Sequence, residues 1–70
     1  MDRNEHLAWC KKRALVYVDA GHLPQAVASF GSDMANHPDI IPDPARLSLG
    51  LTAASFNNAA EVRRWIEGFR

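Results

Sequence analysis

The sequence predicts an all-α protein of four helices arranged as two antiparallel hairpins. Apolar residues recur at helical spacing along four stretches, and each stretch follows residues that favour the N-terminus of a helix. No stretch alternates apolar and polar residues in the way that is typical of a half-buried strand. With 70 residues, the chain has the length of one small domain, so we expect a single unit over residues 1–70 with hairpins at about 3–37 and 44–69.

The first helix is predicted to begin after Asp2, because Asp2 and Glu5 have the spacing of a capping box. It is predicted to end near Gly21, since glycine adopts the left-handed conformation at little cost. A second apolar set lies opposite the predicted buried face, which indicates that this helix is covered on more than one side. The buried face comprises Leu7, Cys10, Ala14, Tyr17, Val18 and Gly21, and the opposite set comprises Trp9, Val16 and Ala20.

The second helix is predicted to follow Gly21 closely, because Pro24 is tolerated in a first helical turn. Pro38 disfavours helical geometry in the residue before it, so this helix is predicted to end by His37. Six residues, apolar except for the last, have the spacing of a single face of this helix. They are Leu23, Ala26, Val27, Phe30, Met34 and His37.

The segment from residue 38 to 43 contains Pro38 and Pro42 and is predicted to be non-helical, with Ile40 and Ile41 against the core. Asp43 followed by Pro44 predicts the start of a third helix, which extends to about Phe56. Gly50 in its middle indicates that another backbone passes close by. The predicted inner face of this helix is Leu47, Gly50, Leu51 and Ala54.

Asn57 and Asn58 interrupt the helical pattern, and Asn58 with Glu61 again has the spacing of a capping box. A fourth helix is therefore predicted from here to the end of the sequence. Its inner face is Val62, Trp65, Ile66 and Phe69.

The two predicted hairpins are related by a shift of 36 residues. This shift pairs positions of the same character, namely small residues, turn formers, apolar contacts and bulky anchors. The two halves therefore look like degenerate copies of one helical hairpin. The pairs are Ala14 with Gly50, Gly21 with Asn57, Ala26 with Val62, and Phe30 with Ile66.

The first hairpin resembles the tetratricopeptide repeat, which implies two antiparallel helices that stack on further helices and serve in protein binding. It departs from that family's pattern at Cys10, Arg13 and Asp33. The positions that carry the resemblance are Ala14, Tyr17, Gly21, Ala26, Phe30 and Pro38.

Three longer strings extend a second resemblance over the whole chain: EHLAWCKKRALVYVDAG, QAVASFGSD followed by HP, and RRWIEGF. In these strings the chain is similar to a family of small proteins encoded by tailed bacteriophages and prophages. The resemblance implies a phage context, a location in the host cytoplasm and action through binding. It implies no catalytic residues.

Composition limits the chemistry that can be expected. Eight basic and eight acidic residues cancel, which removes a general electrostatic attraction to nucleic acid or anionic membranes. No apolar run has the length of a membrane span, and a single cysteine fits a reducing compartment. No pair among His6, His22, His37 and Cys10 has a usual zinc spacing, and Cys10 lies on a predicted buried face. We therefore expect no metal, no cofactor and no enzymatic activity.

The sequence thus favours a protein–protein interaction module that forms a homodimer and binds a phage or host protein through the first helix. A tryptophan that lies off the main buried face of a helix, as Trp9 is predicted to do, is a candidate hot spot for protein binding. The alternative is a small nucleic-acid-binding regulator that uses two basic runs, Lys11, Lys12 and Arg13, and Arg63 and Arg64. The residues expected to bind a partner are Trp9, Lys12, Leu15, Val16 and Asp19.

Overall fold

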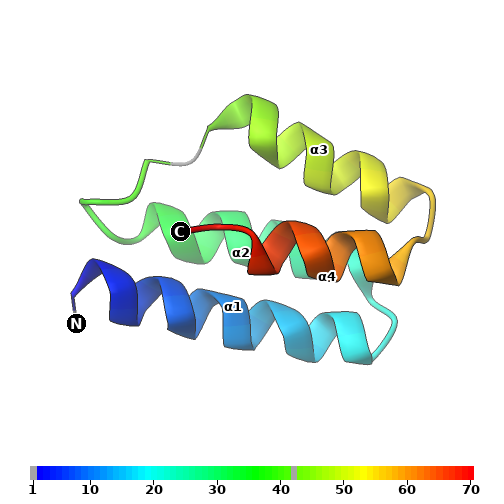
Figure 1. Ribbon diagram of the computed structural model, residues 1–70, viewed down its shortest axis with the longest axis horizontal. Coiled ribbons are helices and arrows are strands. Elements are labelled where there is room, and N and C mark those ends of the chain that lie inside the picture. The colour runs from blue at the N-terminus through cyan, green and yellow to red at the C-terminus, as the bar shows by residue number, and fades with distance from the viewer. Residues whose placement is uncertain (1, 42) are drawn as a thin grey trace.

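A computed structural model describes residues 2–41 and 43–70, and over these it contains four α-helices. They are α1 (Arg3–Asp19), α2 (Leu23–Ala35), α3 (Pro44–Ser55) and α4 (Ala59–Glu67). The helices run roughly along the longest dimension of the molecule, α1 antiparallel to α2 and α3 antiparallel to α4 (Figure 1). The predicted all-α fold of two hairpins is confirmed. Met1 and Pro42, which the sequence analysis included in its predictions, lie outside the described residues.

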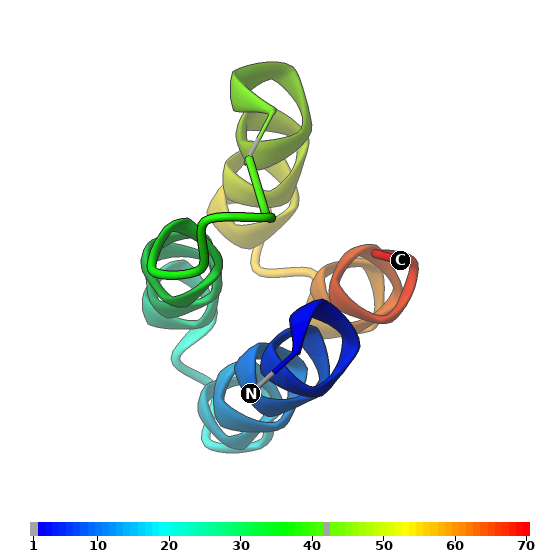
Figure 2. The same ribbon diagram turned by 90° about the vertical axis from the view of Figure 1, so that its left-hand side faces the viewer.

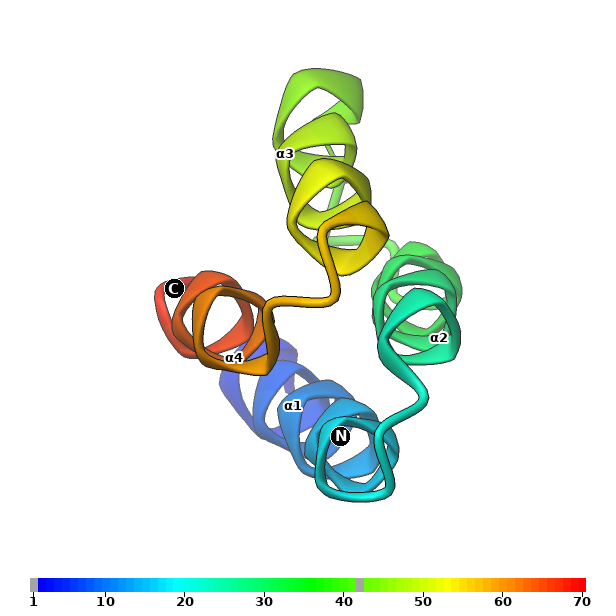
Figure 3. The same cartoon turned by 90° about the vertical axis from the view of Figure 1, so that its right-hand side faces the viewer.

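The four helices form a ring in which each helix contacts the helices on either side of it, and α2 and α4 also contact each other across the ring. End-on views place α1 and α3 at opposite corners and α2 and α4 between them (Figures 2 and 3). In the described part of the chain α1 contacts α2 and α4, α3 contacts the same two helices, and α1 and α3 do not touch. The second hairpin therefore closes onto the first through α4 as well as through α3.

The helix boundaries follow from local chemistry. The Asp2 side chain accepts a hydrogen bond from the Glu5 amide at 2.7 Å, and this bond lowers the pKa of the Asp2 carboxyl. Asp43 accepts from the amide of Ala45 at 3.0 Å at the start of α3. The three predicted starts that depend on an N-terminal capping residue are confirmed, and the third is capped by Asn58, which accepts from the Glu61 amide at 3.1 Å.

The 36-residue relation between the hairpins is visible in the backbone. The last residues of α1 and α3 are Asp19 and Ser55, and the first residues of α2 and α4 are Leu23 and Ala59, so both pairs keep the shift. The turn residues Gly21 and Asn57 both have positive φ, 81° and 55°. The paired interior positions are all buried: Ala14 with Gly50, Ala26 with Val62, and Phe30 with Ile66.

The core lies inside the ring and is built around Phe30 of α2. Its side chain is fully buried, and its ring makes edge contacts with Phe69 and Trp65, with ring centres 4.9 and 5.5 Å apart. The predicted inner faces of α1, α2 and α4 supply most of the surrounding side chains. These are Leu7, Cys10, Ala14, Val18, Leu23, Ala26, Val27, Met34, Val62 and Ile66.

Four details of the prediction are wrong. Gly21 is exposed rather than on the buried face, because α1 ends before it. Ile40 is buried, but Ile41 is 89% exposed, since neighbouring residues of a non-helical segment point to different sides. Leu51 is 52% exposed at the edge of the inner face of α3. A Cβ on Gly50 would lie 2.6 Å from the Trp65 indole, so a side chain rather than a backbone requires this glycine.

Candidate interaction surface on α1

The five residues predicted to bind a partner do not all lie on one surface. Trp9 and Val16 are 37% and 64% exposed, and Lys12 is exposed between them. Leu15 instead packs partly buried against the core. Asp19 is exposed but forms an ion pair with Arg63 of α4, so its carboxylate joins α1 to α4. The structure thus brings three of the five residues together and gives the other two intramolecular contacts.

We call the open side of this helix the outer face of α1, defined by Glu5, Trp9, Lys12 and Val16. Their spacing of four, three and four residues places them along one side of a helix. All four are exposed, because α2 and α4 pack against other sides of α1. Glu5 belongs to this face although the sequence analysis assigned it only a capping role.

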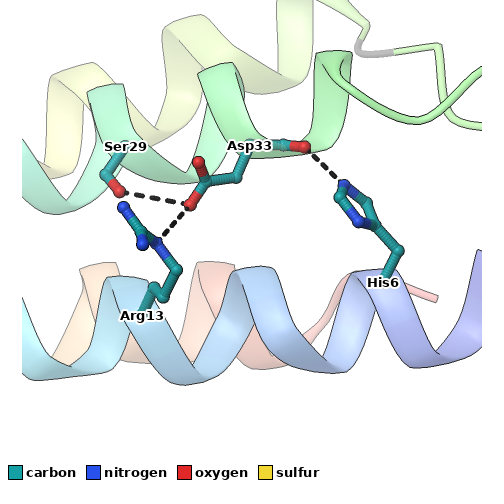
Figure 4. Close-up of polar contacts among 4 residues, drawn as sticks. All are labelled: His6, Arg13, Ser29 and Asp33. Carbon is teal, nitrogen blue, oxygen red and sulfur yellow. Dashed lines mark hydrogen bonds and ion pairs between the residues drawn. The ribbon is translucent and has the colours of Figure 1, made fainter. Parts of the chain in front are cut away.

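A polar cluster around the buried Asp33 lies beside the outer face, between α1 and α2 (Figure 4). Asp33 of α2 is 8% exposed, and its carboxylate accepts from Arg13 Nε at 3.0 Å and from Ser29 Oγ at 3.4 Å. Its backbone carbonyl lies 2.6 Å from Nε2 of His6. Asp33 therefore fixes two side chains of α1, one turn on either side of Trp9.

These fixed side chains hold the Trp9 ring in place. The Arg13 guanidinium carbon lies 4.8 Å from the centre of the Trp9 ring. The His6 ring lies 5.4 Å from Trp9 and 5.1 Å from His37. A half-exposed indole ordered by a cation and an imidazole loses little side-chain entropy when a partner covers it.

An open pocket of about 210 Å³ continues this surface towards the C-terminal end of α1. It is lined by Arg13, Val16 and Tyr17. Arginine and tyrosine, like tryptophan, are enriched among the residues that contribute most to protein–protein affinity. The outer face and this pocket together can accept an apolar side chain next to basic groups.

Sequence reasoning did not predict the role of Asp33, Arg13 and His6 in this surface. The available signal was the departure from the tetratricopeptide pattern at Arg13 and Asp33, which the structure shows to be in contact with each other. An acid that stands where that pattern has a small residue and a base that stands where it has leucine are candidates for an ion pair.

The predicted basic runs are largely engaged within the fold. Lys11 donates to the carbonyl oxygens of Glu67 and Phe69, and Arg13 pairs with Asp33. Arg63 pairs with Asp19, and Arg64 pairs with Glu61 at 3.1 Å. Lys12 alone among the five basic residues makes no hydrogen bond or ion pair with the rest of the described chain.

Cys10 lies on the inner side of α1 and is fully buried. Burial and the nearby Asp33 carboxylate raise the pKa of its thiol from 9.0 to about 11. A thiol in this environment is protonated at neutral pH and is a poor nucleophile. Among residues 2–41 and 43–70, no group of three potential metal-ligating side chains occurs.

Iodoacetamide at about pH 8 is expected to modify Cys10 much more slowly in the folded protein than in urea, because only the thiolate reacts. Raising the pH from about 9 to about 11 should speed the reaction and lower the free energy of unfolding, since the folded state disfavours the ionised thiol. Mass spectrometry after timed quenching measures the rates. Equal rates with and without urea at pH 8 would contradict the assigned burial.

Comparison with protein-family models, with curated proteins and with solved structures finds no match for this chain. Over the described residues, none of the helices combines the length and the apolar character that crossing a membrane requires.

Proposed function

We propose that this chain is a non-enzymatic interaction module of a phage that associates with a second copy of itself and binds a phage or host protein in the host cytoplasm. The binding surface is the outer face of α1. The observation that carries the proposal is the exposed Trp9 side chain, ordered between His6 and Arg13. Ordering an aromatic side chain before binding favours affinity.

Two further observations support this choice of surface. Lys12 and Val16 are exposed beside Trp9, and within residues 2–41 and 43–70 Lys12 forms no hydrogen bond or ion pair that would compete with a partner. The chain also has only 70 residues, and domains of this size often gain stability by burying further apolar surface in an oligomer. Four of the five basic residues of the alternative nucleic-acid surface form hydrogen bonds or ion pairs within the fold, which leaves few of them to contact phosphates.

Val16→Asp is expected to weaken self-association by at least tenfold, because it replaces an apolar contact of the outer face of α1 by a carboxylate that must lose its hydration. The matched control is Leu49→Asp on α3, where the wild-type side chain is 65% exposed and Val16 is 64% exposed. Sedimentation equilibrium at micromolar concentrations measures both variants, and far-UV circular dichroism checks that they remain helical.

The self-association half of the proposal fails if the wild-type protein is monomeric throughout this range, or if Leu49→Asp abolishes association while Val16→Asp has no effect.

The second half of the proposal, binding of a phage or host protein, is tested by capture of proteins from infected cells on immobilised wild type, Trp9→Ala and Leu49→Asp. A specific partner should be lost with Trp9→Ala and retained with Leu49→Asp. Retention with Trp9→Ala would exclude this surface as its binding site.

A further inference from the structure

We propose that two copies of the chain pair through the outer faces of their α1 helices in antiparallel orientation, with Trp9 next to the twofold axis. Glu5 of each copy then contacts Lys12 of the other. This inference rests on the proposed self-association and adds the geometry and the charge pairing of the interface. A twofold arrangement is the commonest one for homodimers, and its surface must be complementary to itself.

The outer face of α1 has the charge pattern that such an arrangement requires. Its N-terminal part carries Asp2 and Glu5, and its C-terminal part carries Lys12 and the half-exposed Arg13 side chain. Trp9 lies between these parts. An antiparallel second copy places the acidic part of one helix against the basic part of the other, so the same favourable contact forms twice.

The helical spacing gives the register. Glu5 and Lys12 are seven residues apart, which is about two turns or about 10 Å along the axis, so they lie on the same edge of the outer face. The twofold axis of an antiparallel pair places this edge of both helices on the same side of the interface. With the axis between residues 8 and 9, Glu5 lies level with Lys12 of the second copy, and the two Trp9 side chains lie next to each other.

Other arrangements of the same two helices are less favourable. A parallel pair places Glu5 against Glu5 and Lys12 against Lys12. An antiparallel pair centred between residues 12 and 13 places Lys12 and Arg13 of one copy against the same two cations of the other. Like charges that face each other across an interface oppose association, so the electrostatics select the register centred near Trp9.

The apolar surface of α3 lacks this self-complementarity. It exposes Leu49, Leu51 and Phe56, but the residues from 47 to 60 contain no charged side chain. Apolar contact alone leaves the orientation of a second copy unspecified. The charge pattern therefore assigns the second copy to α1 rather than to α3.

The size of the interface sets the expected affinity. A helix of 17 residues is about 25 Å long, so contact along α1 alone falls at the lower end of specific interfaces. We expect dissociation constants in the micromolar range, with a clear dependence on salt because the Glu5 and Lys12 pairs lie at the rim.

A charge-reversal cycle tests the proposal. Glu5→Lys and Lys12→Glu are each expected to weaken association about tenfold, because each replaces two attractive contacts by two repulsive ones. The double variant Glu5→Lys/Lys12→Glu should associate within about twofold of wild type. An equimolar mixture of the two single variants should form heterodimers, since each supplies the charges that the other needs. Sedimentation equilibrium at low salt measures all four samples.

Glu67→Lys on α4 is the matched control for charge reversal, because Glu67 is exposed and does not belong to the outer face of α1. It should associate like wild type. Circular dichroism verifies the helicity of Glu5→Lys, which also loses a favourable charge in the first turn. Because heterodimer formation requires both single variants to be folded, recovery in the mixture separates charge pairing from misfolding.

The outcomes distinguish this inference from the function on which it rests. If wild type associates and Val16→Asp weakens it, but the double variant stays as weak as the single variants, the antiparallel charge pairing is wrong and the use of α1 stands. If single reversals leave association unchanged, the Glu5 and Lys12 contact is likewise excluded. If wild type does not associate at all, this inference fails together with the self-association half of the proposed function, and the binding of another protein is still decided by the capture experiment.

Discussion

Phe30→Ala is expected to lower the free energy of unfolding by about 3–5 kcal/mol, because truncation of a fully buried phenylalanine leaves a cavity. A domain of this length has a total stability of roughly 4–10 kcal/mol, so the variant should be largely unfolded in mild urea. The large effect is specific to this fold, because the Phe30 side chain of α2 packs against the aromatic side chains of Trp65 and Phe69 near the C-terminus of the chain.

Phe56→Ala is the matched control, because it removes the same atoms from a side chain that is 78% exposed. Its effect should remain within about 0.5 kcal/mol. Urea denaturation followed by circular dichroism, at concentrations where the protein is monomeric, compares the two. Similar midpoints for both variants would show that Phe30 is not at the centre of the core.

Gly50→Ala is the second substitution with a large expected effect. A Cβ at this position lies 2.6 Å from Cζ2 of Trp65, and the indole cannot move freely because its Nε1 donates to the Arg46 carbonyl at 2.8 Å. Overpacking of this kind costs about 1–3 kcal/mol. The gain of about 1 kcal/mol in helix propensity when alanine replaces glycine offsets part of that cost.

Gly31→Ala provides the control, since it also replaces a glycine within a helix. The nearest side-chain atom to its Cβ is Cδ2 of Leu47 at 3.2 Å, the end of a flexible and only partly buried side chain. The propensity gain is common to both variants, so their difference in unfolding free energy isolates the contact with Trp65. We expect Gly50→Ala to be less stable than Gly31→Ala by about 1–3 kcal/mol. Equal stabilities would mean that Trp65 is not wedged against α3.

The fold was predictable because its signals are local. Capping residues such as Asp2, Asp43 and Asn58 fix helix starts within a few residues of sequence. Positive φ at Gly21 and Asn57 is likewise a property of single residues in turns. The inner faces follow from helical spacing, which is why the fully buried positions of α2 and α4 were identified correctly.

The binding surface was less predictable because it depends on contacts between distant residues. Nothing in the sequence around Asp19 indicates that Arg63 lies close to it, and nothing near Gly50 indicates that Trp65 occupies the space beside it. The exposed side chains of Ile41 and Leu51 show a second limit on predicting burial from the sequence. Apolar character predicts burial only on average, and small domains lack the interior volume to bury every large side chain.

The ion pair between Arg13 and Asp33 has a consequence for hairpin exchange. After the 36-residue shift, the helices of the two hairpins have matching boundaries at their turns. An exchange between two copies would therefore align α1 of one copy with α4 of the other in the way that α1 packs against α2. The 36-residue shift places Phe69 where α2 has Asp33. In such an exchanged pair Arg13 would meet an aromatic ring in place of its carboxylate, and Asp33 would lose its cation. We expect the loss of a cation from the buried Asp33 carboxylate to oppose domain swapping, so that the ion pair with the half-exposed Arg13 identifies α2 as the proper neighbour of α1.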